Sequence, residues 1–348
     1  MLRDVVDGSP FSKSGVGPTE PEASPRLSRR DVMMATLVAT LGMALSPADA
    51  QVVDPHPPTI DISDPQEVAD GVFVLRDRRI WLVPNIGIVV GRDSALVVDS
   101  SLGTGNGERV LDAARRLAGP NRRLFLTTTH FHPEHATGAT VFRRDATIVM
   151  NAVQRDETVA ERSLYLDLFR QTQSPAAVAA LIGAQVTMPH VVFDGSSTTL
   201  DLGDRLVELH STGTAHTRGD LVVNLPKERI LFAGDLIEER MFPIFPWFPP
   251  NDVDVDAARW TQALRGFRSL DPRLIVPGHG DPGGMPIALA LADQIDRAGC
   301  LVRQMRASGI SAADLAKTAK ETLTAAQPRW EHPDLLDWQI AYFAAQTN

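Results

Sequence analysis

The sequence predicts an α+β fold, a four-layer αββα sandwich in which two sheets lie face to face between outer helices, with a helical extension at the C-terminus. Blocks of short apolar strands and helical blocks alternate in the order strands, helices, strands, helices. The composition, 43% hydrophobic and 22% charged, is ordinary for a globular protein. This order favours two mostly antiparallel sheets over a doubly wound parallel sheet.

The first fifty residues read as an export signal. LSRRDVMM (27–34) is followed by an apolar run from Val32 to Leu45, and SPADA ends at Ala50. A charged start, a short apolar run and an A-x-A-like end are typical of a secretory signal. Arg29 and Arg30 resemble the pair of a bacterial twin-arginine signal. We therefore expect cleavage before Gln51 and a periplasmic or otherwise exported protein, with no stable membrane association after cleavage. An amphipathic helix in a cytoplasmic protein is the alternative.

The chain is predicted to continue with a Pro-rich linker over 51–67 and a globular domain over 68–285. The first strand block contains four apolar or alternating runs, separated by turn residues such as Pro84 and Asn85. They are GVFVLR (71–76), IWLV (80–83), IGIVVG (86–91) and SALVVDS (94–100). A helix is predicted over 107–118, then a strand over 122–129 and one or two helices over 152–183.

The second strand block spans 189–234. Its predicted strands are HVVF (190–193), TTLDLG (198–203), RLVELH (205–210), DLVVNL (220–225) and RILFAG (229–234). A helix at about 255–268 and a short strand LIVP (274–277) complete the domain. Residues 286–348 form the predicted helical extension, which is packed on the domain.

A dense histidine cluster follows the strand at 122–129. THFHPEH (129–135) holds three of the nine histidines of the chain. In an extended segment His130 and His132 point the same way and can chelate one metal. Glu134 and His135 can serve a second metal or polarise a water. Imidazole and carboxylate suit zinc, iron or manganese. A histidine-rich surface loop is the alternative.

Three further segments place a polar residue directly after an apolar strand. His216 lies in a glycine-bearing loop, Asp235 follows Gly234, and His279 lies between two glycines. Each segment alone is a weak signal, since glycines are typical of turns. Four such segments in one chain are difficult to explain as turns.

These segments resemble the signature of the metallo-β-lactamase superfamily, H-x-H-x-D-H followed by a lone His, an Asp after Gly and a final His. The resemblance covers about residues 68–285 and implies an αββα sandwich with metals at one edge. It implies metal one on His130, His132 and His216, metal two on Glu134, His135 and His279, and a bridging Asp235. It also implies that Asp99 supports the metal-binding loop, although Asp99 can equally be a strand-end turn residue.

The resemblance further implies hydrolysis. Two zinc ions are expected, with a metal-bound hydroxide that attacks an ester, lactone, thioester or amide-like bond of a small molecule. Asp235 or Glu134 would orient the hydroxide and pass its proton to the leaving group. Glu134 departs from the usual Asp. Its extra methylene moves the carboxylate by about a bond length, which puts the second zinc in question.

The residues after Asp235 are candidates for a pocket wall, and one further histidine is a candidate for a residue that supports the metal ligands. MFPIFPWFPP (241–250) carries four aromatic side chains in a proline-stiffened segment. These aromatic residues are Phe242, Phe245, Trp247 and Phe248. They form either the wall of the substrate pocket or a surface segment packed on the helical tail. His210 is either a supporting donor behind the metal ligands or a histidine that is hydrogen-bonded in place.

Other functions remain as alternatives. Export favours a periplasmic β-lactamase-type antibiotic hydrolase, although true β-lactamases of this fold generally carry Cys or Ser in place of Asp235. A redox protein or an accessory protein without turnover is a further alternative. The net charge of −9 argues against nucleic acid as a partner. Cys300 is the single cysteine, which excludes an intrachain disulfide. The sequence indicates no oligomeric state.

Overall fold

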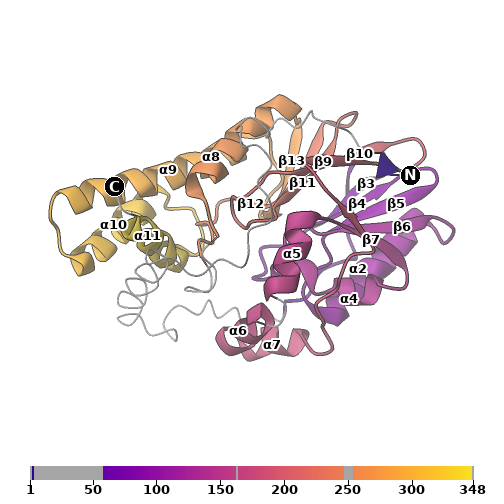
Figure 1. Cartoon of the computed structure of the whole chain (residues 1–348), viewed down its shortest axis with the longest axis horizontal. Coiled ribbons are helices and arrows are strands. Elements are labelled where there is room, and N and C mark those ends of the chain that lie inside the picture. Colours follow the sequence, from indigo (N-terminus) through magenta and orange to yellow (C-terminus); the bar gives the residue numbers. More distant parts are fainter. Residues whose placement is uncertain (1, 4–57, 162–163, 247–253, 347–348) are drawn as a thin grey trace, which may run out of the picture.

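The chain folds into two sheets packed face to face between layers of helices (Figure 1). The computed structural model describes residues 2–3, 58–161, 164–246 and 254–346. Most of the predicted export signal and the first part of the linker lie outside the described residues. The α+β class and the C-terminal helices agree with the sequence prediction.

The first sheet has seven strands in the order β2-β3-β4-β5-β6-β7-β8. The strands are β2 (Gln66–Ala69), β3 (Val72–Leu75), β4 (Ile86–Val90), β5 (Ser94–Val98), β6 (Arg123–Thr127), β7 (Ala146–Asn151) and β8 (Val191–Phe193). β2 to β5 pair antiparallel, but β5 to β8 pair parallel. The expectation of a mostly antiparallel sheet is therefore wrong for this half, because helical crossovers separate these strands and return the chain in the same direction.

The second sheet has six strands in the order β1-β9-β10-β11-β12-β13. They are β1 (Leu2–Arg3), β9 (Ser197–Asp201), β10 (Leu206–Ser211), β11 (Leu221–Leu225), β12 (Ile230–Glu238) and β13 (Leu274–His279). All neighbours pair antiparallel except β12 and β13, which run parallel. This sheet therefore matches the predicted antiparallel character.

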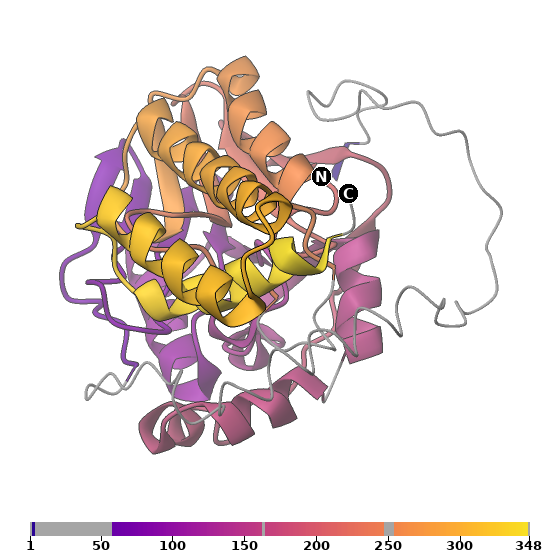
Figure 2. The same cartoon turned by 90° about the vertical axis from the view of Figure 1, so that its left-hand side faces the viewer.

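Helices cover the outer face of each sheet. α2 (Gly103–Ala118) and α4 (Ala139–Phe142) pack on the first sheet, and α8 (Ala257–Gly266) and α9 (Met285–Ala307) pack beside β12 of the second. α10 (Ala312–Ala326) and α11 (Leu336–Ala345) extend the second layer, as Figure 2 shows. The remaining helices are short: α3 (Pro133–Ala136), α5 (Ala152–Glu161), α6 (Leu164–Thr172), α7 (Pro175–Ala180), η1 (Phe267–Leu270) and η2 (Pro333–Leu335).

The first sheet is buried on both faces, which explains its continuous apolar strands. In β5, Ala95 and Val97 face the core beneath α2, whereas Leu96 and Val98 face the core between the sheets. Side chains alternate along a strand, so a strand covered on both sides needs apolar residues at every position. The sequence SALVV meets this requirement.

The strands differ from the prediction at four places. Residues 80–83 form turns instead of a strand, and Leu82 adopts a positive φ of 62° there. The sequence does not predict β1, β2 or β7. β7 reads ATIVMN, a run too short to distinguish from a buried helix segment by periodicity. Among the helices that the structure describes, none has the length and apolar character of a membrane span.

Candidate metal centre

Seven buried side chains meet at one edge of the sandwich, where the loops after several strands converge. Their donor atoms form two groups, and within each group these atoms lie within 4.8 Å of one another. The first group is His130, His132, His216 and Asp235, and the second is Glu134, His135, Asp235 and His279. Asp235 belongs to both groups, so its carboxylate lies between them. The two sets coincide with the predicted ligands, whose binding of metal stays a prediction.

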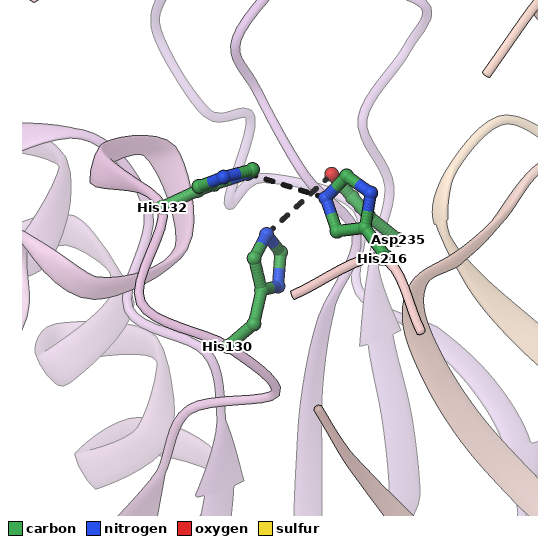
Figure 3. Close-up of side chains that lie close together, drawn as sticks. All are labelled: His130, His132, His216 and Asp235. Atoms are coloured by element: carbon green, nitrogen blue, oxygen red, sulfur yellow. Dashed lines mark hydrogen bonds and ion pairs between the residues drawn. The ribbon is translucent and has the colours of Figure 1, made fainter. Parts of the chain in front are cut away.

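The distances within the groups suit a metal ion. His132 Nδ1 and His216 Nε2 are 3.2 Å apart, and His130 Nε2 is 3.8 Å from Asp235 Oδ2 (Figure 3). In the second group Asp235 lies 3.2 Å from His135 Nε2 and 3.7 Å from His279 Nε2. Donors about 2.1 Å from a tetrahedral zinc are about 3.4 Å from each other. The spacing is therefore close to that of a zinc site.

The histidine cluster turns from strand to helix within a few residues. β6 ends at Thr127, and His132 caps α3 with extended backbone angles. Pro133 occupies the first turn of α3, where its missing N–H costs nothing. The predicted loop is thus a one-turn helix that carries Glu134 and His135. This turn separates the second donor group from His130 and His132.

Asp99 holds the cluster from the neighbouring strand. Its Oδ1 accepts the backbone N–H of Thr129 at 2.6 Å, and its Oδ2 accepts the Thr129 hydroxyl at 2.9 Å. His135 donates its Nδ1–H to the same Oδ2 at 2.9 Å, which leaves Nε2 toward the second group. Asp99 is buried and has a φ of +67°, an uncommon value for a residue other than glycine. Asp99 therefore orients a predicted ligand, as the family resemblance implied.

The loop that carries His216 is fixed by two buried carboxyl groups. Asp220 accepts the N–H and the hydroxyl of Thr217, and Glu157 of α5 accepts the N–H of Arg218 at 2.9 Å. Burial raises the pKa of Asp220 to about 7 and that of Glu157 to about 9. Gly219 lies between Arg218 and Asp220 in this loop. A Cβ atom at Gly219 would come 2.6 Å from the backbone of Gln154 in α5, so there is no space for a side chain. α5 and this loop are thus in close contact.

The loop that carries His279 is held by the turn between β3 and β4. Asp77 Oδ2 accepts the N–H of Gly280 at 2.7 Å. Asn85 donates to the carbonyls of Pro277 and Gly280 at 3.0 and 2.9 Å. Gly280 has a φ of +91°, which glycine tolerates best. A small cavity of about 20 Å³ borders His279 here and is lined in part by Trp81, Met241 and His332.

The histidines of the first donor group have the protonation state of metal ligands. Burial, and then the neighbouring histidines, hold the pKa of His130 and of His132 well below the usual range. Burial likewise lowers the pKa of His216 to about 4. Neutral imidazole is the form that binds a metal. Burial also lowers the pKa of His135, but Asp235 and Asp99 outweigh that effect and raise it well above the usual range.

Several buried donor atoms form no hydrogen bond among the described residues, and the imidazole and Asp235 atoms among them meet only in the ion-pair contacts given above. These atoms are His130 Nε2, Glu134 Oε2, His135 Nε2, Asp235 Oδ1 and Asp235 Oδ2. Buried polar groups are normally hydrogen-bonded, paired or bound to a metal. Imidazole nitrogen and carboxylate oxygen are the donors that zinc takes. The residues therefore fit two divalent cations.

The aromatic segment after Asp235 does not form the predicted pocket wall in its described part. Phe242 and Phe245 are fully buried. Phe242 packs against Trp330, and Phe245 packs against Trp260, Tyr342 and Phe343. The prediction is wrong for these two residues, because residues of the C-terminal extension cover them, as its alternative expected. Trp247 and Phe248 lie outside the described residues.

His210 lies on β10 and pairs through Nε2 with Glu208 at 3.0 Å. It belongs to neither donor group. This contact agrees with the alternative of a histidine hydrogen-bonded in place.

The sequence does not indicate four buried carboxyl groups beside the predicted ligands or their loops: Asp77, Glu157, Asp220 and Glu238. Glu238 is fully buried, and its Oε2 accepts the N–H of Ile244 at 2.9 Å. Burial, and then the charge of Asp235, raise its pKa well above the usual range. The signal in the sequence is that Glu238 lies three residues after the predicted ligand Asp235. In a regular strand, however, that spacing places the two side chains on opposite faces.

Comparison with known proteins agrees with this geometry. A family model described as the metallo-beta-lactamase superfamily matches residues 79–279. The acyl-coenzyme A thioesterase MBLAC2 of Bos taurus is 25% identical over 248 residues, which are 67% of this chain and 87% of that protein. The metallo-beta-lactamase type 2 of Bacteroides fragilis is 32% identical over 90 residues, 25% of this chain and 34% of that protein. The solved metallo-beta-lactamase from Pontibacter korlensis shares the fold, with a TM-score of 0.50 and 19% identity, over 66% of this chain and 98% of that chain.

Proposed function

Because the chain belongs to the metallo-β-lactamase superfamily of hydrolases, we propose that it is a dinuclear zinc hydrolase that cleaves thioesters of small molecules. The observation that carries this proposal is the position of Asp235, which is shared by two complete groups of buried donors. One group alone would support a single cation. Two groups joined through one carboxylate support a pair of cations that act on the same substrate.

Different residues would bind the cations, orient the ligands and transfer the proton in such a site. His130, His132 and His216 would hold one cation, Glu134, His135 and His279 the other, and Asp235 both. Bound divalent cations lower the pKa of a coordinated water toward neutrality and polarise a carbonyl oxygen. Asp99 keeps His135 in the orientation that points Nε2 into the site. The carboxylate of Asp235 would orient the attacking water and accept its proton.

Glu134 is the second candidate for proton transfer. It is buried, its Oε2 has no hydrogen-bond partner among the described residues, and burial raises its pKa to about 8. A carboxyl group with a pKa near the working pH can both accept and return a proton. Such a group can donate the proton to the leaving group.

The substrate class is supported by the curated relatives. MBLAC2 proteins of three vertebrates, named acyl-coenzyme A thioesterases, align with 67% of the chain. A β-lactam substrate is the second candidate, favoured by the 32% identity to the Bacteroides fragilis enzyme over a short segment. Thioesters and β-lactams are both carboxylic acid derivatives, and in both the water attacks the carbonyl carbon. We propose that the substrate approaches from the side of His279, the most exposed of the predicted ligands.

The first experiment measures the metal content of the purified protein by elemental analysis. Two zincs per chain are expected. A single zinc would instead indicate a mononuclear hydrolase in which Glu134 does not support a second site. Two irons would contradict the zinc hydrolase and favour the redox alternative.

The second experiment compares substrates. The zinc-loaded protein is assayed with acyl-coenzyme A thioesters, homoserine lactones and β-lactams, and Asp235→Asn is the control. We expect the highest kcat/KM for a thioester and a loss of about 10²–10⁴-fold in the variant, the range of a general base. Hydrolysis of β-lactams without thioester hydrolysis would contradict the proposed substrate. Equal activity of wild type and Asp235→Asn would contradict the proposed site.

A further inference from the structure

Glu238, the last residue of β12, carries a buried carboxyl oxygen that the two donor groups do not explain. The side chain is fully buried, and Oε2 accepts the N–H of Ile244. Oε1 is buried too and has no hydrogen-bond partner among the described residues. An unpartnered carboxyl oxygen in the interior costs free energy unless a cation or a donor lies beside it.

The backbone brings Glu238 to the second donor group. β12 and β13 run parallel, with Gly234 opposite Pro277 and Glu238 opposite His279. Four residue steps on β12 thus span only two steps on β13. This irregularity interrupts the alternation of side chains and allows Asp235 and Glu238 to approach the same site despite their spacing of three.

Three carboxyl groups are enclosed together at this edge of the sheet. After burial, the charge of Asp235 is the main influence that raises the pKa of Glu238, and Glu134 adds to it. All three side chains are at most 1% exposed. Like charges in a buried site repel each other strongly, and a divalent cation would offset this repulsion.

We propose that Glu238 is a third carboxylate of the metal centre. Without being a ligand, it stabilises the cation that Glu134, His135 and His279 would hold. Glu238 is absent from the donors that lie within 4.8 Å of one another. We therefore assign it a positioning and electrostatic role and not that of a direct ligand. The inference rests on the proposed function, because it requires that the second cation is bound.

The test is zinc binding by Glu238→Gln, without any substrate. Glutamine has the same shape and keeps a carbonyl oxygen for the N–H of Ile244, so only the charge is lost. Titration with Zn²⁺ against a chromophoric chelator gives both dissociation constants. We expect the second zinc to bind about 10–100-fold more weakly, as for other residues that support metal ligands, and the first zinc to be unaffected.

Glu228→Gln is the matched control. Glu228 is also a carboxyl group with a nearly buried side chain, one oxygen paired with Arg205 at 3.0 Å and the other without a hydrogen-bond partner among the described residues. It lies before the start of β12 and belongs to neither donor group, so its variant should bind both zincs as the wild type does. An equal loss in both variants would overturn the inference.

The remaining outcomes separate the inference from the proposed function. Two zincs bound with unchanged affinity by folded Glu238→Gln would overturn only the inference. A wild-type protein that binds a single zinc would overturn both. If Glu238→Gln does not fold, Glu238→Met removes the charge with an apolar side chain of similar length, and wild-type affinity for the second zinc in that variant would overturn the inference.

Discussion

Asp99 shows how one side chain can set the chemistry of a site without belonging to it. It lies behind His135 and bonds both the ring of that histidine and the backbone that follows β6. The bond to Nδ1 fixes the tautomer that leaves Nε2 for a metal. The left-handed backbone of Asp99 places the carboxylate where both partners reach it.

Asp99→Asn is expected to weaken zinc binding about 10–100-fold, because an amide cannot accept all three hydrogen bonds of the carboxylate. Asparagine tolerates a positive φ, so the backbone is preserved. Zinc affinity measured by chelator competition checks the prediction. Asp271→Asn is the control, since Asp271 also has a positive φ, of 48°, but is exposed and pairs with Arg229. Equal affinities in both variants would contradict the role of Asp99.

The sequence indicated the seven grouped residues because each follows or ends an apolar strand, and strand ends converge at the edge of a sheet. It did not indicate Glu238, whose approach depends on a strand irregularity between Gly234 and Glu238. It could not assign Phe242 and Phe245 to the core, because the residues that cover them, Trp330 and Phe343, lie about 90–100 residues further along the chain. Contacts of this kind depend on tertiary packing and not on local pattern.

Among the elements, the loops that carry His216 and His279 are each held by a carboxyl group from a distant segment. Glu157 and Asp77 accept backbone N–H groups of these loops. A rigid loop keeps its histidine in place before a metal binds, which reduces the free energy needed to organise the site. α5, which supplies Glu157, is therefore part of the support of the site.

Glu157 is expected to make the stability of the protein depend on pH. Its pKa is about 9 in the folded chain because of burial, against 4.5 in the unfolded chain. Between these values the folded chain keeps a proton that the unfolded chain releases, so the free energy of unfolding falls as the pH rises. The slope is about 1.4 kcal/mol per pH unit for one proton.

Glu157→Gln cannot release this proton, so its free energy of unfolding should fall less steeply with pH than that of the wild type. Denaturant unfolding of both zinc-saturated proteins from pH 5 to 8 measures the two slopes. Asp156→Asn, on the exposed side of the same helix, controls for the loss of an acidic side chain. Parallel slopes in wild type and Glu157→Gln would argue against a buried proton at this position.

The elements themselves were predicted best where length and periodicity agree. The helix expected over 107–118 is observed as Gly103–Ala118, and five strands of the second block lie where expected. IWLV has strand-like residues but forms turns between Asp77 and Asn85, which both bond the loop of His279. Local propensity does not report such contacts.

At the scale of the whole molecule, we propose that the protein is exported from the cytoplasm. Arg29 and Arg30 are expected to direct it through the twin-arginine route, with cleavage before Gln51. Intact mass and cell fractionation in a bacterial host should show a mature protein outside the cytoplasm. Arg29→Lys with Arg30→Lys should leave the full-length chain inside. Export of that variant at the wild-type level would contradict this route.

The C-terminal helices and the metal-bearing sandwich share one core, so we expect them to unfold together. Phe343 of α11 is buried against Phe245, which precedes α8 in the chain and stacks on Trp260; Trp260 in turn contacts His216. Phe343→Ala should cost about 3–5 kcal/mol. This loss should lower the Tm by roughly 5–15 °C.

The measurement follows thermal unfolding of this variant by circular dichroism and by release of zinc to a chelator. Leu206→Ala, at an apolar residue that is 52% exposed, is the control and should change stability by less than about 0.5 kcal/mol. Both signals should move together in Phe343→Ala, because a chain of ring contacts joins α11 to a predicted ligand. Loss of helix at a lower temperature than zinc release would mean that the extension folds independently of the metal centre.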